Sequence, residues 1–335
     1  MAILRVCAEE GGRLFKTSGG DWRLRLNRMI TNCSPEAPVV ILIHGLRYSW
    51  RQGRGCNPQT TLYLAEPLEE DRRRRPLRAN WPHQLGFTEN GREDGVCIAF
   101  GWDAGRISDL RKADEMLARH TPALVSVIEA IHAAGREADC FGHSLGSALV
   151  LNAIFNQPGL PVRRALLLGP AERRSRAAQA ALVQQNHAQT EFLHVMARAN
   201  DVFDEAYHQL APRAEDVYDP PLGVEGIGVA LSNWMDLQID HPETRRWLAS
   251  CGLPPTRPPE RLSHWAYYND PSVMAFYASV LRDTAPSCLK TLRDVRAPIE
   301  IETRWQRLQP AFFPALGGGK RSATQADAEM ASSTA

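Results

Sequence analysis

Short runs of consecutive apolar residues recur along the chain, and each predicts a β-strand that is buried on both faces. The first, VVILI at residues 39–43, lies between Pro38 and Gly45. Similar runs follow at residues 96–102, 138–141, 164–169 and 192–197. A strand that is apolar at every position, rather than at every second one, is typical of a parallel sheet covered by helices on both sides.

The segments between these runs mostly carry apolar residues at helical spacing. Between the second and third runs, the sequence predicts two helical pieces, at residues 109–120 and 122–135. Thr121 would be the N-cap of the second piece, Pro122 its first residue and Gly135 its C-cap. Strands that alternate with helices predict an α/β fold with a doubly wound, mainly parallel sheet.

Three more helices are predicted further along. Residues 147–155 are apolar enough for a buried helix, whereas residues 174–187 suit a more polar surface helix. A last helix should begin after Asp270, a good N-cap, with Pro271 at its first position. We expect this last helix to close the domain.

Two long stretches, at about residues 46–95 and 204–263, do not follow the simple alternation of strands and helices. Both are far longer than the usual connection in an α/β unit. Both contain several aromatic residues, which favours packed structure over disorder. We therefore predict one domain over residues 1–316, with the two stretches as pocket walls or a lid, and a disordered tail over residues 317–335.

Composition and charge exclude several classes of function. The 335 residues are 44% hydrophobic and 23% charged, as in an ordinary globular protein. The 39 basic and 38 acidic residues nearly balance, so no overall field favours a nucleic acid or an anionic membrane. No uninterrupted apolar run approaches the roughly eighteen residues needed to cross a bilayer, and the densest, VVILI, has five. We expect neither nucleic-acid binding nor integral membrane association, and the sequence assigns no oligomeric state.

The cysteines argue against a disulfide framework and against a metal site. There are seven, an odd number, and none forms a C-x-x-C pair. The first residues, MAILRVCAEE, reach acidic positions too early for the apolar core of a secretory signal. We therefore expect free thiols, no metal and a cytoplasmic location.

The pentapeptide GHSLG at residues 142–146 contains the candidate nucleophile, Ser144. It matches G-x-S-x-G, in which glycines allow a strained turn that exposes a serine between a strand and a helix. The pattern alone also occurs by chance in tight turns. Here an apolar strand precedes it and a helix of small and branched residues follows it, which favours the nucleophile.

A serine hydroxyl is a poor nucleophile at neutral pH, so it needs a base and a group that orients that base. Asp201 follows the strand predicted at residues 192–197 and is the favoured acid, with Asp204 as the alternative. The alternative, non-catalytic interpretation is that Asp201 forms an Asx turn or a helix cap. His264, in the loop before the last helix, is the candidate base, although it could be a surface histidine packed beside Trp265.

The developing oxyanion needs preorganised donors. We expect the main-chain N–H groups of Leu145, directly after the nucleophile, and of Leu46, in the turn after the first strand. Weaker candidates for substrate binding lie close to these positions: His44, Arg47, Trp50 and His143. Of these, His44 and His143 are more readily explained as residues that shape their turns.

In this order, the segments VVILIHG, GHSLG, ARANDVFD and SHWAYYNDP resemble an α/β-hydrolase fold serine hydrolase. The segments IAFGWDAG and LGVEGIG add a likeness to a bacterial branch whose members mostly lack assigned substrates. The resemblance covers about residues 38–282 and implies Ser144, Asp201 and His264 as the triad, with Leu46 and Leu145 in the oxyanion hole. The long stretch after Leu46 departs from the general pattern and could redirect the second oxyanion donor.

The resemblance implies a serine hydrolase that needs no cofactor and cleaves a carboxylic ester of a small molecule through an acyl-enzyme. The same triad could serve a thioesterase, an amidase or an acyltransferase, and the motifs do not separate these activities. A binding module that keeps the fold without catalysis is a further alternative. It would be expected to lack a member of the triad.

Overall fold

The computed structural model describes residues 3–53, 55–64, 80–87, 94–187, 190–211 and 219–283. Contacts divide the chain into two units, Met1–Ile301 and Glu302–Ala335. The second unit lies wholly outside the described residues. Two predicted regions therefore also lie outside the described residues: the end of the predicted domain, residues 284–316, and the predicted disordered tail, residues 317–335.

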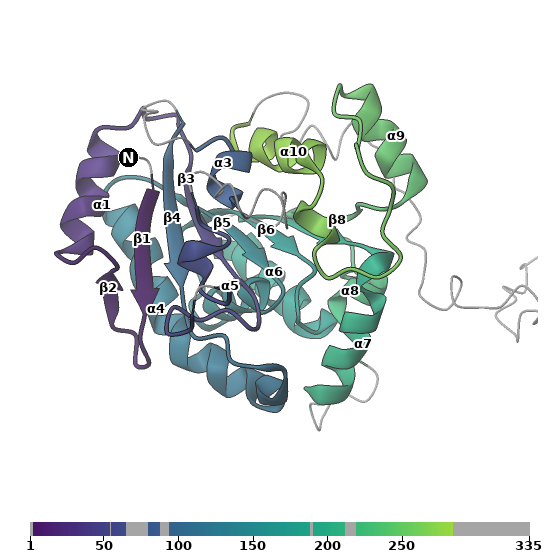
Figure 1. Cartoon of the computed structure of the whole chain (residues 1–335), viewed down its shortest axis with the longest axis horizontal. Coiled ribbons are helices and arrows are strands. Elements are labelled where there is room, and N and C mark those ends of the chain that lie inside the picture. Colours follow the sequence, from purple (N-terminus) through teal and green to yellow (C-terminus); the bar gives the residue numbers. More distant parts are fainter. Residues whose placement is uncertain are drawn as a thin grey trace, which may run out of the picture. The chain divides into compact units, whose positions relative to one another are not determined.

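Within the described residues, eight strands form one sheet in the order β2-β1-β4-β3-β5-β6-β7-β8 (Figure 1). The pairing of β2 with β1 is antiparallel, and all the other pairings are parallel. The protein therefore has an α/β fold with a mainly parallel sheet. The strands are β1 (Ile3–Ala8), β2 (Leu14–Lys16), β3 (Val39–Ile43), β4 (Val96–Gly101), β5 (Ala138–His143), β6 (Val162–Leu168), β7 (Glu191–Met196) and β8 (Trp234–Gln238).

The five predicted strands are confirmed as β3 to β7. β3, β4 and β5 are buried at every position, and β6 and β7 at all positions but one each. This burial explains why their sequences are continuously apolar. The structure adds β1, β2 and β8, which lie at the two sides of the sheet and whose sequences contain charged residues such as Arg5 and Asp236.

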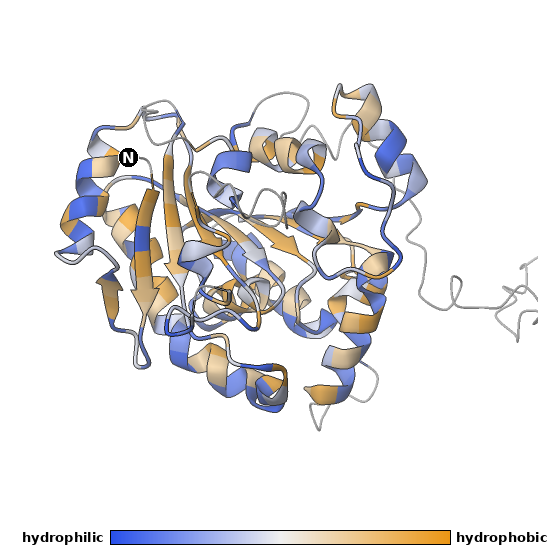
Figure 2. Cartoon of the chain, in the orientation of Figure 1, coloured by the Kyte–Doolittle hydropathy of each residue, from blue (hydrophilic) through white to orange (hydrophobic). Residues whose placement is uncertain are grey.

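Helices cover both faces of the sheet. Buried residues of α1, α4, α5 and α6 join one hydrophobic cluster with the sheet, and those of α3, α9 and α10 join another on the opposite face. Figure 2 shows the apolar central strands between helices with hydrophilic outer positions. The helices are α1 (Trp22–Thr31), α3 (Trp81–Gln84), α4 (Ala113–Ala133), α5 (Leu145–Asn156), α6 (Arg174–His187), α7 (Asp201–Leu210), α8 (Leu222–Glu225), α9 (Pro242–Ser250) and α10 (Pro271–Leu281).

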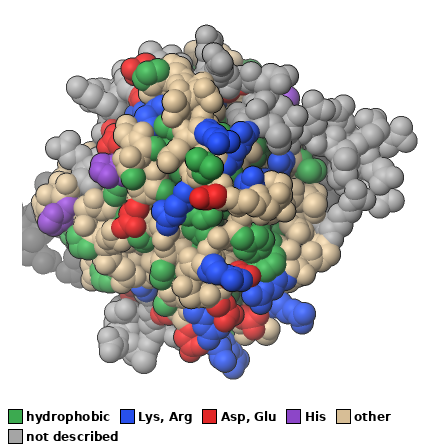
Figure 3. Space-filling model, turned by 90° about the vertical axis from the view of Figure 1, so that its left-hand side faces the viewer, with side chains coloured by type: hydrophobic (Ala, Val, Ile, Leu, Met, Phe, Trp, Pro, Cys, Tyr) green, Lys and Arg blue, Asp and Glu red, His purple; other side chains and the backbone are tan. Residues whose placement is uncertain are grey.

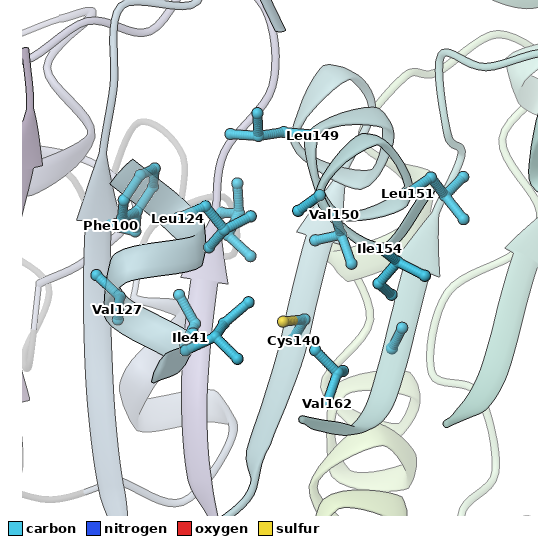
Figure 4. Packing of buried hydrophobic residues seen from close by; sticks show 14 of the residues in the cluster. Ile41, Phe100, Leu124, Val127, Cys140, Leu149, Val150, Leu151, Ile154 and Val162 are labelled. Atoms are coloured by element: carbon cyan, nitrogen blue, oxygen red, sulfur yellow. The ribbon is translucent and has the colours of Figure 1, made fainter. Parts of the chain in front are cut away.

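Helix α5 packs directly on the centre of the sheet, and this packing fixes the position of its first turn. Ten of its residues are buried, from Leu145 to Ile154. Figure 4 shows Val150 and Ile154 facing Cys140 on β5 and Val162 on β6. Burial of such side chains contributes roughly 1.5 to 3 kcal/mol each, so the strand-to-helix turn before α5 has a rigid support.

One helix prediction is wrong. Residues 113–133 form one continuous helix, α4, rather than two pieces that meet at Thr121. Thr121 is not an N-cap, because its hydroxyl donates to the carbonyl of Leu117 one turn earlier, at 2.8 Å. Pro122 lies inside the helix. Because α4 is buried against the sheet and α5, its packing outweighs the local signal to stop.

Other predicted helix ends agree with the structure. Gly135 follows α4 with φ +77°, a conformation that favours glycine, and its N–H donates to the carbonyl of His132. The predicted helix 174–187 is α6. Asp270 caps α10 by accepting from the N–H of Ser272 at 2.9 Å, with Pro271 at the first position.

The two long stretches have different outcomes. In the first, residues 54, 65–79 and 88–93 lie outside the described residues, and the rest includes the 3-10 helix η1 (Pro58–Thr60) and α3. The second contains α8, β8 and α9. Because β8 pairs with β7, that part belongs to the central sheet and not to an added wall. A lid formed by either stretch stays a prediction.

The surface carries charges of both signs. Figure 3 shows one face, on which basic and acidic side chains lie interspersed, in keeping with the formal net charge of +1. Within the described ranges, no helix is both long and apolar enough to cross a membrane.

Candidate functional site

Ser144 lies at the turn between β5 and α5, next to the point where the strand order reverses. β3 pairs with β4 on one side and with β5 on the other, and Ile43 is in register with Gly142. In open α/β sheets, ligands bind beyond the carboxyl ends of the strands at such a switch point. The turn after β3, which holds Leu46, and the turn after β5, which holds Ser144, are therefore neighbours.

The backbone of Ser144 is strained. Its dihedral angles are φ 57° and ψ −123°, a region that residues other than glycine rarely occupy. The Ser144 N–H donates to the carbonyl of Leu168 at the end of β6, at 2.9 Å, and α5 begins at the next residue. The packed strand and helix thus hold Ser144 in a strained strand-to-helix turn.

Three glycines make this turn possible because neighbouring backbone comes too close for any side chain. A Cβ on Gly146 would lie 2.2 Å from the carbonyl oxygen of Ile43, and a Cβ on Gly142 would lie 2.8 Å from the nitrogen of Ser147. A Cβ on Gly45 would lie 2.7 Å from that of Ser144. Steric exclusion therefore explains why both glycines of GHSLG are glycine. The turn after β3 lies directly against Ser144.

The two predicted oxyanion donors lie at this junction. Leu145 is the first residue of α5, where N–H groups have no acceptor within the helix and the helix dipole is positive. Leu46 follows Gly45, whose backbone abuts Ser144. Within the described residues, no main-chain acceptor is bonded to the Leu46 N–H. Both residues thus lie close to Ser144, and their role as oxyanion donors stays a prediction.

His264 is brought to the same end of the sheet by two main-chain contacts. The N–H of Ser263 donates to the carbonyl of Ala199 at 2.9 Å, and Nε2 of His143 lies 2.9 Å from the carbonyl oxygen of His264. The His143 and His264 ring centroids are 4.6 Å apart. The base candidate is therefore fastened to the residue that precedes Ser144, although no hydrogen bond joins Ser144 Oγ to His264 within the described residues.

The ring of His264 has a side-chain partner that sequence reasoning missed. Nδ1 of His264 lies 2.6 Å from Oδ1 of Asn200, and the Phe203 ring centroid is 4.8 Å from that of His264. Burial lowers the pKa of His264 from 6.5 to about 4. A neutral amide and an aromatic ring surround an imidazole that stays neutral well below pH 7.

Among the contacts of the described residues, no hydrogen bond joins His264 to either of the two carboxylates considered as the acid. Asp201, the favoured acid, lies with Oδ1 3.5 Å from the Arg198 guanidinium. Asp204, the alternative, accepts from Nδ2 of Asn200 at 2.9 Å, so it is linked to the His264 ring only through Asn200. Both are buried. Within the described residues, the side-chain partner of His264 Nδ1 is therefore Asn200 Oδ1. Asp201 as the acid stays a prediction.

The weaker substrate-binding candidates have mostly structural contacts. Both ring nitrogens of His44 contact main chain, Nδ1 with the Gly45 oxygen and Nε2 with the Trp102 N–H, and burial lowers its pKa to about 3. The Trp50 indole donates to the carbonyl of Ala8 at 3.0 Å, on the side of β1. These contacts leave neither side chain with a polar group for a substrate.

His143 and Arg47 differ from that pair. His143 is buried, and burial together with nearby His264 and His44 holds its pKa well below 6.5. Its Nε2 donates to the carbonyl of His264, so the His143 ring holds the loop of His264 in place. Arg47 is exposed, with φ 74° and its N–H bonded to the carbonyl of Gly105. The Arg47 side chain stays a candidate for substrate contact.

Asn200 could have been found only from a weak signal. It is the last residue of the 3-10 helix η3 (Arg198–Asn200), directly before α7, where an asparagine reads as a cap. Its side chain makes no capping hydrogen bond.

Within the described residues, no group of three or more His, Cys, Asp or Glu is arranged to hold a metal ion.

Comparison of the whole chain with known protein families, with curated proteins and with solved structures finds no match.

Proposed function

We propose that this protein is a serine hydrolase of the α/β-hydrolase type that cleaves a carboxylic ester of a small molecule. The observation that carries the proposal is the strained backbone of Ser144 between β5 and α5, enclosed by three glycines. Such strain persists only where the surrounding structure maintains it, and it clusters at active sites. The helix start at Leu145 and the fastening of His264 to His143 support the same proposal.

The chemistry would follow from these positions. Ser144 Oγ attacks the ester carbonyl carbon while His264 Nε2 takes its proton. The negative oxygen that forms is met by the N–H groups of Leu145 and Leu46. Collapse of this intermediate breaks the bond to the alcohol, which leaves with the proton from His264. Water then attacks the acyl-enzyme, again with His264 as base, and releases the acid and free Ser144.

A covalent probe tests the nucleophile directly. Wild-type protein should be labelled by a fluorescent fluorophosphonate, which phosphonylates activated serines, and Ser144→Ala should not be labelled. Ser147→Ala is the matched control, because Ser147 is buried three residues further on and its hydroxyl has no partner within the described residues. Labelling that survives in Ser144→Ala, or fails in wild type, would contradict the proposal.

The substrate class needs a second assay. A series of p-nitrophenyl esters of increasing acyl length should be hydrolysed by wild type and not by Ser144→Ala. Matched thioester and amide substrates, and an added alcohol as acceptor, distinguish ester hydrolysis from thioesterase, amidase and acyltransferase activity. Faster turnover of any of these than of the ester would reassign the reaction while leaving Ser144 as nucleophile.

A further inference from the structure

We infer that Asn200, oriented by Asp204, is the positioning residue for His264, in the place where a carboxylate is expected. Two distances carry this: 2.6 Å from His264 Nδ1 to Asn200 Oδ1, and 2.9 Å from Asn200 Nδ2 to Asp204 Oδ1. The inference deepens the proposed function and rests on it for its kinetic consequences. The structural core of the inference, the orientation of an imidazole by an amide, can be tested separately.

The orientation of the Asn200 amide follows from its partners. An amide has an acceptor oxygen on one side and a donor NH₂ on the other, and a carboxylate can only accept. The NH₂ of Asn200 must therefore face Asp204, which turns Oδ1 towards His264. The positions of the amide oxygen and nitrogen are thus fixed by the chemistry of their partners.

This orientation fixes the tautomer of His264. Because Oδ1 of Asn200 can only accept, Nδ1 of His264 must carry the hydrogen. Nε2 then has the free lone pair that a general base needs. A carboxylate would do the same and would also stabilise the charged imidazolium, whereas a neutral amide holds the ring with less effect on its charge.

The surroundings keep the pair in place. Asn200 and Asp204 are 1% and 4% exposed. A Cβ on Gly223 would lie 2.5 Å from Asp204 Oδ2, so α8 packs against the carboxylate. The backbone of Gly223 is in turn held by the Arg198 guanidinium, which donates to its carbonyl at 2.7 Å. The relay from α8 to Asp204, Asn200 and His264 is thus closely packed.

Other titratable groups also face this arrangement. His143 approaches the His264 ring from β5, and Tyr267, three residues after His264, interacts with Asp204 and Arg198. Asp201 pairs with Arg198 on the same helix turn. A change in the pH profile must therefore be compared between variants that leave these four groups intact.

The first test reads the tautomer of the full-length protein by nitrogen NMR of the histidine rings and needs no activity. We expect His264 with hydrogen on Nδ1 and, as an internal control, His143 with hydrogen on Nε2, because the latter donates to a carbonyl. Asn200→Leu and Asp204→Leu should each release the His264 ring into a mixture of tautomers. Hydrogen on Nε2 of His264 in wild type, or no change in either variant, would overturn the inference.

The second test exchanges the two partners. The double variant Asn200→Asp with Asp204→Asn keeps both hydrogen bonds, since the new carboxylate can accept from His264 and from the new amide. We expect kcat of an ester substrate to fall by on the order of a hundredfold or more in Asn200→Leu, with little change in KM. The double variant should recover to within about tenfold of wild type, with its acid limb displaced to higher pH by about one unit or more.

The two hypotheses fail in different ways. Wild type that shows the Nδ1 tautomer but no fluorophosphonate labelling would refute the proposed function and leave the inference standing. Labelling and turnover in Asn200→Leu equal to those of wild type would refute the inference alone. Asp201→Asn is the matched control for a neighbouring buried carboxylate. If its kcat falls as far as that of Asn200→Leu while the double variant shows no recovery, Asp201 is the orienting group instead.

Discussion

At the residue scale, the geometry of Ser144 depends on neighbouring glycines, which have no Cβ atom. Gly45, Gly142 and Gly146 each lie where a Cβ would come within 3 Å of backbone or of Ser144 itself. The strain at Ser144, with φ 57°, is maintained by β3, β6 and α5 together. A single methyl group at one of these glycines should therefore act on both stability and reactivity.

We predict that Gly146→Ala lowers the free energy of unfolding by about 3 kcal/mol, because the new methyl group overlaps backbone that cannot give way. The displaced turn should also abolish fluorophosphonate labelling of Ser144. Urea unfolding and gel labelling measure the two effects. Gly53→Ala is the control, because nothing lies within 4 Å of the position that its Cβ would take. Equal stability and labelling of both variants would show that the elbow is not sterically determined.

The pH dependence of activity also belongs to the residue scale. Burial lowers the pKa of His264 to about 4, and the base must be neutral to accept a proton from Ser144. We therefore predict that kcat/KM stays nearly constant from pH 7.5 to pH 5 and falls only as the pH approaches 4. A half-maximal value near pH 6.5, the ordinary pKa of histidine, would contradict the lowered pKa of this ring.

The sequence suggests Ser144 and His264 as candidates but gives no sign of the contact between His264 and Asn200, for a physical reason. The elbow is a local pattern, and the histidine follows from the order of the chain. The contact between Asn200 and His264 joins residues 64 positions apart and depends on where α7 begins relative to β7. Two carboxylates stand within four residues of Asn200, so the sequence favoured a charged partner.

At the element scale, the central strands were predictable and the outer ones were not. β3 to β7 bury nearly every side chain, so their sequences carry an unmistakable run of apolar residues. β8 includes Asp236, which accepts from the His194 ring at 2.7 Å and from the Trp234 indole. That internal polar cluster makes the strand look like a loop in the sequence.

Helix α4 shows the opposite case, in which a strong local signal is wrong. The pair Thr121 and Pro122 is typical of a helix start. In the structure the Thr121 hydroxyl bonds backwards to Leu117 instead, and Asn152 of α5 donates to that hydroxyl at 2.6 Å. Contacts between helices, which no local pattern encodes, decide the outcome.

Helix α10 follows the loop of His264, and its cap is tied to two segments. Asp270 accepts from the Ser272 N–H at 2.9 Å and from the Arg257 N–H at 2.8 Å. We predict that Asp270→Ala lowers the free energy of unfolding by about 2 kcal/mol, at the upper end for an N-cap. Asp21→Ala, which removes the exposed cap of α1, is the control and should cost about half as much. Equal losses in urea unfolding would show that the Arg257 contact adds nothing.

At the scale of the whole molecule, buried neutral histidines make stability depend on pH. Burial lowers the pKa of His44 to about 3 and holds that of His143 well below 6.5. Below pH 6.5 the unfolded chain binds protons at these residues and the folded chain does not, so stability falls as the pH falls. The stability that comes from burying His44 and His143 in the neutral form is fully present above pH 6.5.

We therefore predict that His44 contributes a loss of about 2 kcal/mol between pH 6.5 and pH 5, and that His143 adds a loss in the same direction. Urea unfolding at pH 7, 6 and 5 measures it, in a range above the ordinary pKa values of the carboxylates. His44→Gln should show a smaller loss than wild type over the same range, whatever its stability at pH 7. A flat stability curve from pH 7 to pH 5 would show that these rings are protonated in the folded protein.

For the whole molecule, we propose that one serine, Ser144, is the nucleophile, held in a strained turn at the centre of the sheet. The most direct measurement is the mass of the intact protein after reaction with a fluorophosphonate, followed by peptide mapping. We predict a single adduct per chain, located on Ser144. An adduct on any other residue, or an unchanged mass under conditions in which the protein is folded, would contradict it.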